Sequence, residues 1–170
     1  MGVAGSQILI CPATTMDAVG INAIYAPFVV GTTVLSETEP PSVSDMASRI
    51  EVNIKTYGYF VAESAGMILG YAYGSQYRPR PAYQNSAEVS VYIAPVAQGR
   101  GLGQAIYKAL IEHLTDWGFY TLIGIVTIPN PASARLHKAC GFELVGILQD
   151  VGKKFDNWHG IAIFQLMIDD

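Results

Sequence analysis

The stretch Ala87–Ile128 constrains the fold most, because it carries a strand pattern, a glycine-rich turn, a helix pattern and a second strand pattern in succession. Ala87–Ile93 is predicted to be a strand, and Thr121–Ile128 is apolar and rich in the β-branched residues that strands favour. Between them, Gly101–Trp117 is predicted to be a helix with one apolar face. The residues of that face lie four apart: Leu102, Ile106, Leu110 and Leu114. We therefore expect a sheet that carries helices.

Strand and helix patterns continue on both sides of this stretch. Further strands are predicted at Gln7–Cys11, Tyr59–Glu63, Met67–Tyr73, Phe142–Leu148 and Gly160–Ile168. Further helices are predicted from Thr14 or Thr15 towards Phe28, from Ser42 or Ser44 to Gly58, and over Pro131–Cys140. This order predicts an α/β (α+β) fold, with a mixed central sheet of about seven strands flanked by about four helices. No linker divides the 170 residues, so a single domain, 1–170, is expected.

The composition excludes several classes of protein. Hydrophobic residues make up 51% of the chain and charged residues 14%, which favours a compact fold over disorder. The net charge of -4 argues against nucleic acid as a partner, and no apolar run is long enough to span a membrane. Cys11 and Cys140 form no C-x-x-C pair, so we expect free thiols and no metal. The start of the sequence has no signal-peptide pattern, so a cytoplasmic location is expected.

The segment Gln98–Gly103, with the sequence QGRGLG, joins a predicted strand to a predicted helix. A helix N-terminus offers free N–H groups and a partial positive charge, and glycine lets the backbone approach a ligand closely. Such a segment can cradle a pyrophosphate. Its glycine spacing is neither that of a P-loop nor that of a dinucleotide fold. The alternative is a flexible loop whose glycines only end the neighbouring elements.

Two groups of polar residues lie near this segment in the predicted order of elements. Strand alternation places Glu88, Ser90 and Tyr92 on one face just before the glycine-rich segment. Ser133 and His137 are four apart, so they share a helix face, and Asn130 stands at the entrance of that helix. Each group has a simpler explanation. The first could be the solvent-facing side of a strand, and in the second Asn130 could be a helix cap and His137 a surface histidine. Together with the glycine-rich segment they indicate a catalytic site.

The two motifs QGRGLG and NPASARLHKACGF resemble those of the Gcn5-related N-acetyltransferase superfamily. The resemblance covers about Ile8 to Leu166, and it is closest to the phosphinothricin and methionine sulfoximine acetyltransferase branch. The segments similar to that branch are Thr38–Pro40, Tyr71–Tyr73, Tyr77–Tyr83, Glu88–Tyr92, Leu136–His137 and Lys153–Trp158. His137 supports this branch, which has histidine there, whereas many superfamily members have tyrosine. Many relatives carry an aromatic residue near position 35, where this chain has Leu35, and the resemblance implies that this segment lines the acceptor pocket.

The resemblance implies direct acetyl transfer from acetyl-CoA to a small-molecule amine, such as phosphinothricin or methionine sulfoximine or sulfone. Acetyl-CoA would lie between two parted strands of the sheet. The residues expected to bind it are Val91, Tyr92, Ile93, Gly99, Arg100, Gly101, Leu102, Gly103, Gln104, Asn130 and Ser133. Glu88 is the expected base for the attacking amine. Either His137 or Tyr92 would supply a proton or a hydrogen bond to the leaving thiolate.

The acceptor site is expected to recognise an anionic group. Arg78 and Arg80 lie in the loop Gln76–Asn85, and guanidinium groups suit a carboxylate or a phosphinate, although loop arginines are more often plain surface charge. The substrate-binding residues that we predict are Arg78, Pro79, Arg80, Tyr83, Glu88, Val89, Ser90 and Lys154.

The resemblance also suggests a homodimer in which Lys153–Trp158 reaches across to the partner's site. The alternative for this segment is an exposed hairpin tip. Two other functions stay open, namely an acetyltransferase acting on a protein N-terminus and a coenzyme A sensor without catalysis.

Overall fold

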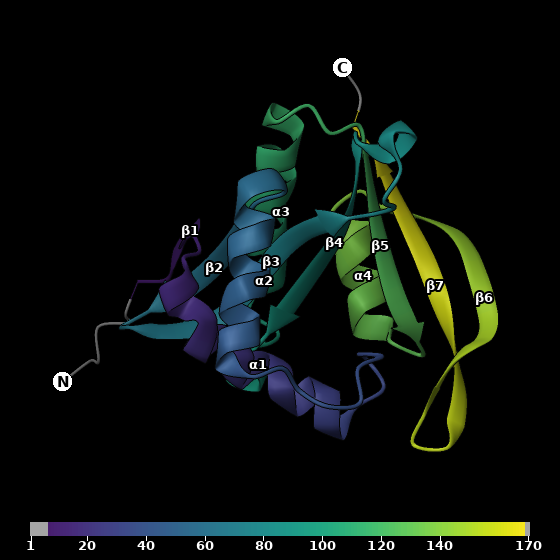
Figure 1. Ribbon diagram of the computed structural model, residues 1–170, viewed down its shortest axis with the longest axis horizontal. Coiled ribbons are helices and arrows are strands. Elements are labelled where there is room, and N and C mark those ends of the chain that lie inside the picture. The colour runs from purple at the N-terminus through teal and green to yellow at the C-terminus, as the bar shows by residue number, and fades with distance from the viewer. Residues whose placement is uncertain (1–6, 169–170) are drawn as a thin grey trace.

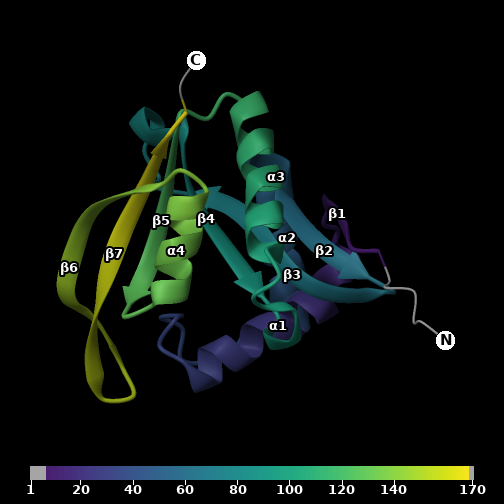
Figure 2. The same cartoon turned by 180° about the vertical axis from the view of Figure 1, so that it is seen from behind.

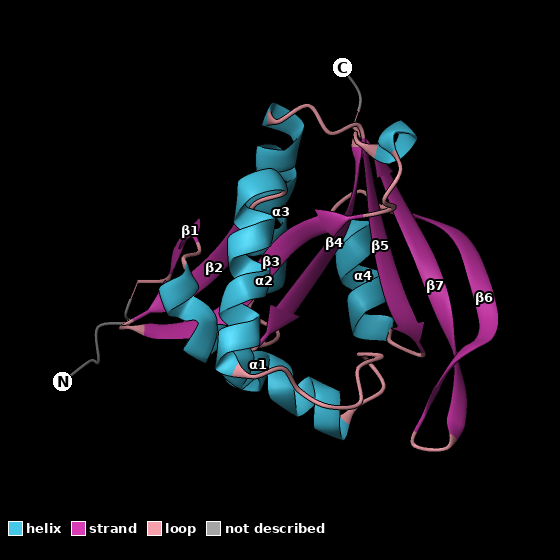
Figure 3. Cartoon of the chain, viewed as in Figure 1, coloured by secondary structure: helices cyan, strands magenta, loops and turns pink. Residues whose placement is uncertain are grey.

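The computed structural model describes residues 7–168, in which a seven-stranded mixed sheet carries two long helices on one face and a long and a short helix on the other (Figures 1 and 2). The strands are β1 (Leu9–Pro12), β2 (Tyr59–Ser64), β3 (Met67–Gln76), β4 (Ser86–Ile93), β5 (Thr121–Ile128), β6 (Glu143–Lys154) and β7 (Asn157–Met167). The helices are α1 (Ala18–Gly31), α2 (Val43–Thr56), α3 (Leu102–Asp116) and α4 (Pro131–Ala139), as Figure 3 shows by colour. The predicted fold class is confirmed.

The sheet has the order β1-β2-β3-β4-β5-β7-β6, and its one parallel pair is β4 with β5 within the described residues. That pair extends over three residues of each strand, Ser86–Glu88 and Thr121–Ile123. Beyond Glu88 the two strands diverge (Figure 1). The backbone of the rest of β4 therefore faces a gap on its β5 side, which confirms the predicted parting of the strands.

Each face of the sheet has its own hydrophobic core. On one face, α1 and α2 bury Ile21, Val29 and Ile50 against β2 and β3. On the other, α3 buries the apolar residues predicted for it, including Ile106 and Leu110, against the central strands. Side-chain alternation along β4 divides its residues between the two cores, so that Val89, Val91 and Ile93 pack towards α3 and Tyr92 towards α1.

The last two strands are longer than the sequence pattern predicts. The predictions Phe142–Leu148 and Gly160–Ile168 were wrong in length, because β6 and β7 continue to a hairpin tip at Phe155–Asp156. Both tip residues have positive φ, 51° and 59°, the geometry of the two-residue turn that matches strand twist. The residues near the tip are mostly polar and exposed, so they carry no alternation of apolar residues that could reveal a strand.

The start of α1 also differs from the prediction. Residues Thr15–Asp17 form a 3-10 turn, which Thr14 caps by accepting a hydrogen bond from the Met16 N–H across 3.2 Å, and the α-helix begins at Ala18. Over residues 7–168, none of the helices combines the length and the apolar character that a bilayer span requires.

Candidate active site

Two cavities open where β4 and β5 diverge. The first, the hairpin-side cavity, has a volume of about 540 Å³ and lies between the β6–β7 hairpin and the segment that follows α1. The second, the glycine-loop cavity, has a volume of about 630 Å³ and lies between β4, the start of α3 and α4. A smaller space of about 50 Å³ lies between them. Val34 and Tyr92 line all three, so the two cavities meet at these side chains.

The glycine-loop cavity is built largely from main chain. Gly101 caps α3 with a φ of +75°, a conformation that glycine adopts without strain, and no side chain caps the helix. The first amides of α3 are therefore free to bind an anion. A Cβ on Gly103 would lie 3.4 Å from both Ile93 and Leu136, so a larger side chain would project among the groups that line this cavity.

The predicted coenzyme residues gather around this cavity, with one exception. The residues in its lining are Val91, Tyr92, Ile93, Gly99, Gly101, Leu102, Gly103, Gln104, Asn130 and Ser133. Arg100 is exposed and is not part of that lining. Asn130 also caps α4, because its side chain accepts a hydrogen bond from the Ser133 N–H across 3.1 Å.

Glu88 is the last residue of β4 that pairs with β5, and it lines the hairpin-side cavity together with Ser90 and Tyr92. The predicted shared face of these three residues is thus what the structure shows. Glu88 is half-buried, and burial raises the pKa of its carboxyl group above the usual value, because a charge is less stable away from water. A carboxylate of raised pKa is a better proton acceptor than an exposed one.

Tyr92 contacts an aromatic cluster on the α1 face of the sheet. Its ring centroid lies 5.6 Å from that of Tyr25, 5.8 Å from that of Phe28 and 5.2 Å from that of Tyr71. Burial raises the pKa of the Tyr92 phenol well above its ordinary value. The hydroxyl therefore keeps its proton at neutral pH and is available as a hydrogen-bond donor.

His137 is buried, with 4% of its surface exposed, and both of its ring nitrogens have partners. Nδ1 lies 2.8 Å from the carbonyl oxygen of Ser133, which can only accept, so Nδ1 carries the proton. Nε2 then accepts a hydrogen bond from the Tyr107 hydroxyl across 3.1 Å. Burial lowers the pKa of His137, which favours the neutral ring. The Nδ1 proton of His137 is thus already engaged in a hydrogen bond to the backbone carbonyl of Ser133.

Gly124 on β5 leaves the room for this ring. A Cβ at that position would overlap the Nε2 atom of His137, so the imidazole would have to move. The imidazole also stacks on Phe164, at a centroid distance of 5.0 Å. His137 is therefore a packed core residue whose ring edge adjoins the small space between the cavities.

The remaining residues predicted to bind the acceptor are scattered. Val89 packs on the α3 face of the sheet and lines only the small space between the cavities. Lys154 lines the hairpin-side cavity, but its ammonium group donates to two backbone carbonyls. Arg78, Pro79, Arg80 and Tyr83 lie in an exposed loop outside that cavity, where Arg78 stacks on the rings of Tyr77 and Tyr83.

Sequence reasoning missed several residues of the cavity wall. Thr33–Ser36, between α1 and α2, form one side of the hairpin-side cavity, and Tyr73, Thr127 and His159 also line it. Tyr73 was detectable, because it pairs with Ser90 across the β3–β4 ladder and so shares its face. No local pattern marked Thr33–Ser36, although the family resemblance implied that the segment around Leu35 lines the acceptor pocket. Among residues 7–168, no three His, Cys, Asp or Glu side chains are grouped in a way that could hold a metal ion.

A sheet parted beside a glycine-capped helix, with one cavity on each side of the gap, is the arrangement that the resemblance to acetyl-CoA-dependent N-acetyltransferases implies. The model of a family described as "Acetyltransferase (GNAT) domain" matches residues 10–161, so the chain belongs to the GNAT acetyltransferases.

Named relatives agree with the predicted branch. The chain is 42% identical over 151 residues to phosphinothricin N-acetyltransferase of Alcaligenes faecalis, covering 88% of this chain and 77% of the relative. It is 33% identical over 159 residues to L-methionine sulfoximine/L-methionine sulfone acetyltransferase of Pseudomonas aeruginosa, covering 92% of each. The crystal structure of a GNAT phosphinothricin acetyltransferase of Sinorhizobium meliloti in complex with acetyl-CoA superposes with a TM-score of 0.90 at 34% identity, covering 95% of this chain and 88% of that one.

The hydrogen bond from Tyr107 to His137 can be tested through stability. Tyr107→Phe should lower the free energy of unfolding by about 1–3 kcal/mol, because the buried Nε2 atom loses its donor. Tyr71→Phe is a matched control, since the Tyr71 hydroxyl is buried without a hydrogen-bond partner and its removal should cost less. Urea unfolding of both variants at pH 7 measures the difference. Equal losses would show that the Tyr107 hydroxyl does not hold His137.

Proposed function

We propose that this protein transfers the acetyl group of acetyl-CoA to the amine of a small amino-acid-like acceptor, such as phosphinothricin or methionine sulfoximine or sulfone. The observation that carries the proposal is the position of Glu88. Its carboxyl group lies on the wall of the hairpin-side cavity, next to the point where β4 leaves β5. The glycine-loop cavity, on the other side of that point, suits the coenzyme. The names of the relatives support this choice of acceptor.

The residues around the glycine-loop cavity fit acetyl-CoA. The free amides at the start of α3 suit its pyrophosphate, and the unpaired edge of β4 over Val91–Ile93 suits the amides of its pantetheine arm. The bound coenzyme supplies the acetyl thioester. A backbone N–H on this edge can donate to the thioester oxygen, where negative charge develops as the amine attacks.

Glu88 and Tyr92 act at opposite ends of the reaction, Glu88 on the attacking amine and Tyr92 on the departing sulfur. Glu88 takes a proton from the ammonium form of the acceptor, so that the neutral nitrogen can form the new C–N bond while the C–S bond breaks. The nitrogen then loses a second proton to give the amide, and that proton neutralises the departing thiolate. Tyr92, which lines both cavities, donates a hydrogen bond to the departing sulfur. We assign this role to Tyr92 rather than to His137, because the Nδ1 proton of His137 is bonded to the Ser133 carbonyl.

We further propose that the protein is a homodimer. β6 is the outermost strand of the sheet, and five of its apolar side chains are between 46% and 55% exposed: Leu144, Val145, Ile147, Leu148 and Val151. An apolar edge strand of this kind readily pairs with another chain. Val151–Lys153 of the hairpin line the cavity of their own subunit, whereas Arg78 and Arg80 do not. If these arginines bind the acceptor's carboxylate, they do so in the partner's site.

The whole proposal can be tested with one assay of thiol release. Purified protein is mixed with acetyl-CoA and, in turn, phosphinothricin, methionine sulfone, methionine sulfoximine and a peptide with a free N-terminus. We expect turnover with the amino-acid analogues and at least about a hundredfold lower kcat/KM with the peptide. Turnover with the peptide alone would favour the protein N-terminus as substrate, and coenzyme binding without any turnover would favour a sensor.

The coenzyme cavity is tested by Gly103→Val. The added side chain would project between Ile93 and Leu136, so we expect the KM for acetyl-CoA to rise at least about tenfold, near 1.4 kcal/mol. Glu112→Val is the control, because it places the same side chain at an exposed position of the same helix, outside both cavities. An unchanged KM in folded Gly103→Val protein would contradict the assignment of this cavity.

The base is tested by Glu88→Gln, which should lower kcat by about 10²–10⁴ and leave acetyl-CoA binding intact. The acidic limb of the pH–rate profile should disappear, since that limb reports the protonation of Glu88. Because burial raises its pKa, charged Glu88 costs stability above that pKa. Glu88→Gln should therefore be at least as thermostable as the parent protein at pH 7, with a smaller difference near pH 4. A kcat within a few-fold of the parent would exclude Glu88 as the base.

The shared acceptor site is tested by Arg80→Ala. It should raise the KM of methionine sulfone more than that of its decarboxylated amine, because a charged hydrogen bond is worth about 1.5–3 kcal/mol. Subunits carrying Arg80→Ala are then mixed with subunits carrying Glu88→Gln. If Arg80 acts in the partner's site, each mixed dimer has one intact site and activity returns. No recovery in dimers that light scattering shows to have exchanged would exclude this arrangement.

A further inference from the structure

Lys154 joins the two walls of the hairpin-side cavity. Its side chain is buried, with 7% of the residue's surface exposed, and it comes from the hairpin wall. Its Nζ atom donates across 2.6 Å to the carbonyl of Val29 and across 2.7 Å to the carbonyl of Leu35. Val29 lies in the last turn of α1, where carbonyls have no partner within the helix. The ammonium therefore holds the end of α1 and the segment that follows it.

That segment, Thr33–Ser36, is the opposite wall of the same cavity, and its Val34 also lines the glycine-loop cavity. It lacks regular secondary structure, so its position depends on such contacts. A weaker contact comes from the Thr127 hydroxyl, which lies 3.4 Å from the Val34 carbonyl. The hydrogen bonds of Lys154 are shorter, and their donor is a charged ammonium group, so they are the stronger contact.

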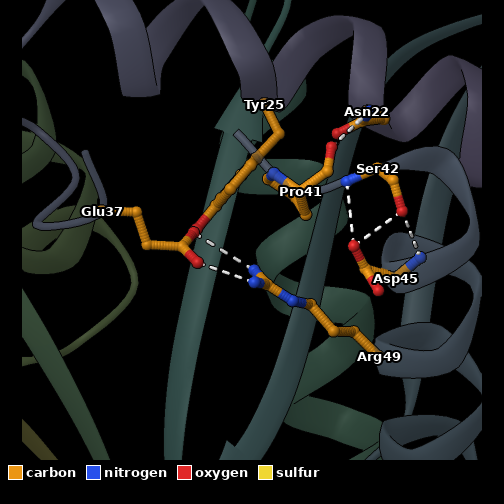
Figure 4. A network of polar contacts seen from close by, with 7 residues as sticks. All are labelled: Asn22, Tyr25, Glu37, Pro41, Ser42, Asp45 and Arg49. Atoms are coloured by element: carbon orange, nitrogen blue, oxygen red, sulfur yellow. Dashed lines mark hydrogen bonds and ion pairs between the residues drawn. The ribbon is translucent and has the colours of Figure 1, made fainter. Parts of the chain in front are cut away.

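The far end of the segment is fixed separately. Glu37 forms a bidentate ion pair with Arg49 of α2, at 3.1 and 2.6 Å, and accepts a hydrogen bond from Tyr25 of α1 (Figure 4). Asn22 donates to the Pro41 carbonyl across 3.1 Å in the same figure. These contacts tie the segment to its own helices, and the Lys154 bonds tie it to the hairpin.

The position of Lys154 along the hairpin is itself constrained. It is the last residue of β6, paired with Asn157, and the two-residue turn follows at once. His159 Nε2 lies 3.2 Å from the Lys154 carbonyl, which adds a contact from β7. The main chain at Lys154 therefore has little freedom, and its side chain transmits that position to Thr33–Ser36.

We propose that Lys154 is a positioning residue, which holds Thr33–Ser36 against the hairpin to shape the acceptor site and does not bind the acceptor's carboxylate. This inference rests on the proposed function, because it assigns the acceptor to the hairpin-side cavity. Lys154 then acts on every acceptor alike, whatever its charge, because it acts through the wall. A lysine that bound the carboxylate would act on carboxylate-bearing acceptors alone.

The first experiment compares Lys154→Met with Lys55→Met, an exposed lysine of α2 that forms an ion pair with Glu51. Hydrogen–deuterium exchange is measured in peptides covering Thr32–Ser36 and α3. We expect exchange in Thr32–Ser36 to be at least about tenfold faster in Lys154→Met, with α3 changed by less than about twofold and Lys55→Met like the parent protein. Unchanged exchange in Thr32–Ser36 would overturn the proposal.

The second experiment measures kinetics of Lys154→Met with methionine sulfone and its decarboxylated amine. We expect the KM of both acceptors to rise by the same factor, at least about tenfold, with a smaller change for acetyl-CoA. A loss at least about tenfold greater for methionine sulfone would show that Lys154 binds the carboxylate and would overturn the proposal. If the parent protein transfers no acetyl group, the proposed function fails, and the exchange experiment still decides whether Lys154 holds the segment.

A third measurement needs no variant and applies even if Lys154→Met does not fold. Reductive methylation of the native protein is followed by mass spectrometry at each lysine. Lys154 should react at least about tenfold more slowly than the neighbouring Lys153, whose side chain is 52% exposed, and equally fast after denaturation. Equal rates in the native protein would show that the Lys154 ammonium is not held, and would overturn the proposal.

Discussion

The early end of the β4–β5 ladder is the feature on which the rest of the molecule depends. Three residues of each strand pair, and the strands then diverge. The unpaired β4 edge needs a partner, since backbone N–H and C=O groups away from water are costly when unbonded. A ligand that is itself rich in amides can supply those bonds. The same divergence leaves Glu88 on the wall of the hairpin-side cavity and Tyr92 where the two cavities meet, so one backbone feature creates both the unpaired edge and the face that carries these side chains.

The chemistry beside the gap follows from differences in burial. Glu88 is half-buried and forms no ion pair within residues 7–168, and burial raises the pKa of its carboxyl group. His137 is fully enclosed, and Tyr107 and the Ser133 carbonyl use both of its nitrogens. The histidine thus fixes the start of α4, where Asn130 and Ser133 face the glycine-loop cavity. Packing therefore explains the presence of this histidine in the motif as well as a role in proton transfer would.

The sequence was sufficient for the parts that short-range patterns determine. Alternation along β4 predicted that Glu88, Ser90 and Tyr92 share a face, and the apolar residues spaced four apart after Gly101 predicted the helix that the structure shows as α3. It was insufficient where contacts join distant segments. Tyr107 meets His137 across 30 residues, and Lys154 meets Val29 across 125. The periodicity of apolar residues along the sequence does not predict contacts between such distant residues. The β6–β7 hairpin was predicted too short for a related reason, because cross-strand bonds and a tight turn extend it through a polar stretch.

The two cavities differ in what builds them, and this difference bears on how their ligands can change. The glycine-loop cavity depends on backbone amides and on glycines, which substitutions at most positions leave intact. The hairpin-side cavity is lined by side chains from β3, β4, β5, the β6–β7 hairpin and Thr33–Ser36. A change in β3, β5 or the hairpin alters its shape without changing a residue of the glycine-loop cavity, whereas Val34 and Tyr92 line both cavities. Because Lys154 and Glu37 fix Thr33–Ser36 at its two ends, residues between these anchors can vary while the wall stays in place. The wall of the hairpin-side cavity can therefore change while the backbone frame of the glycine-loop cavity stays constant.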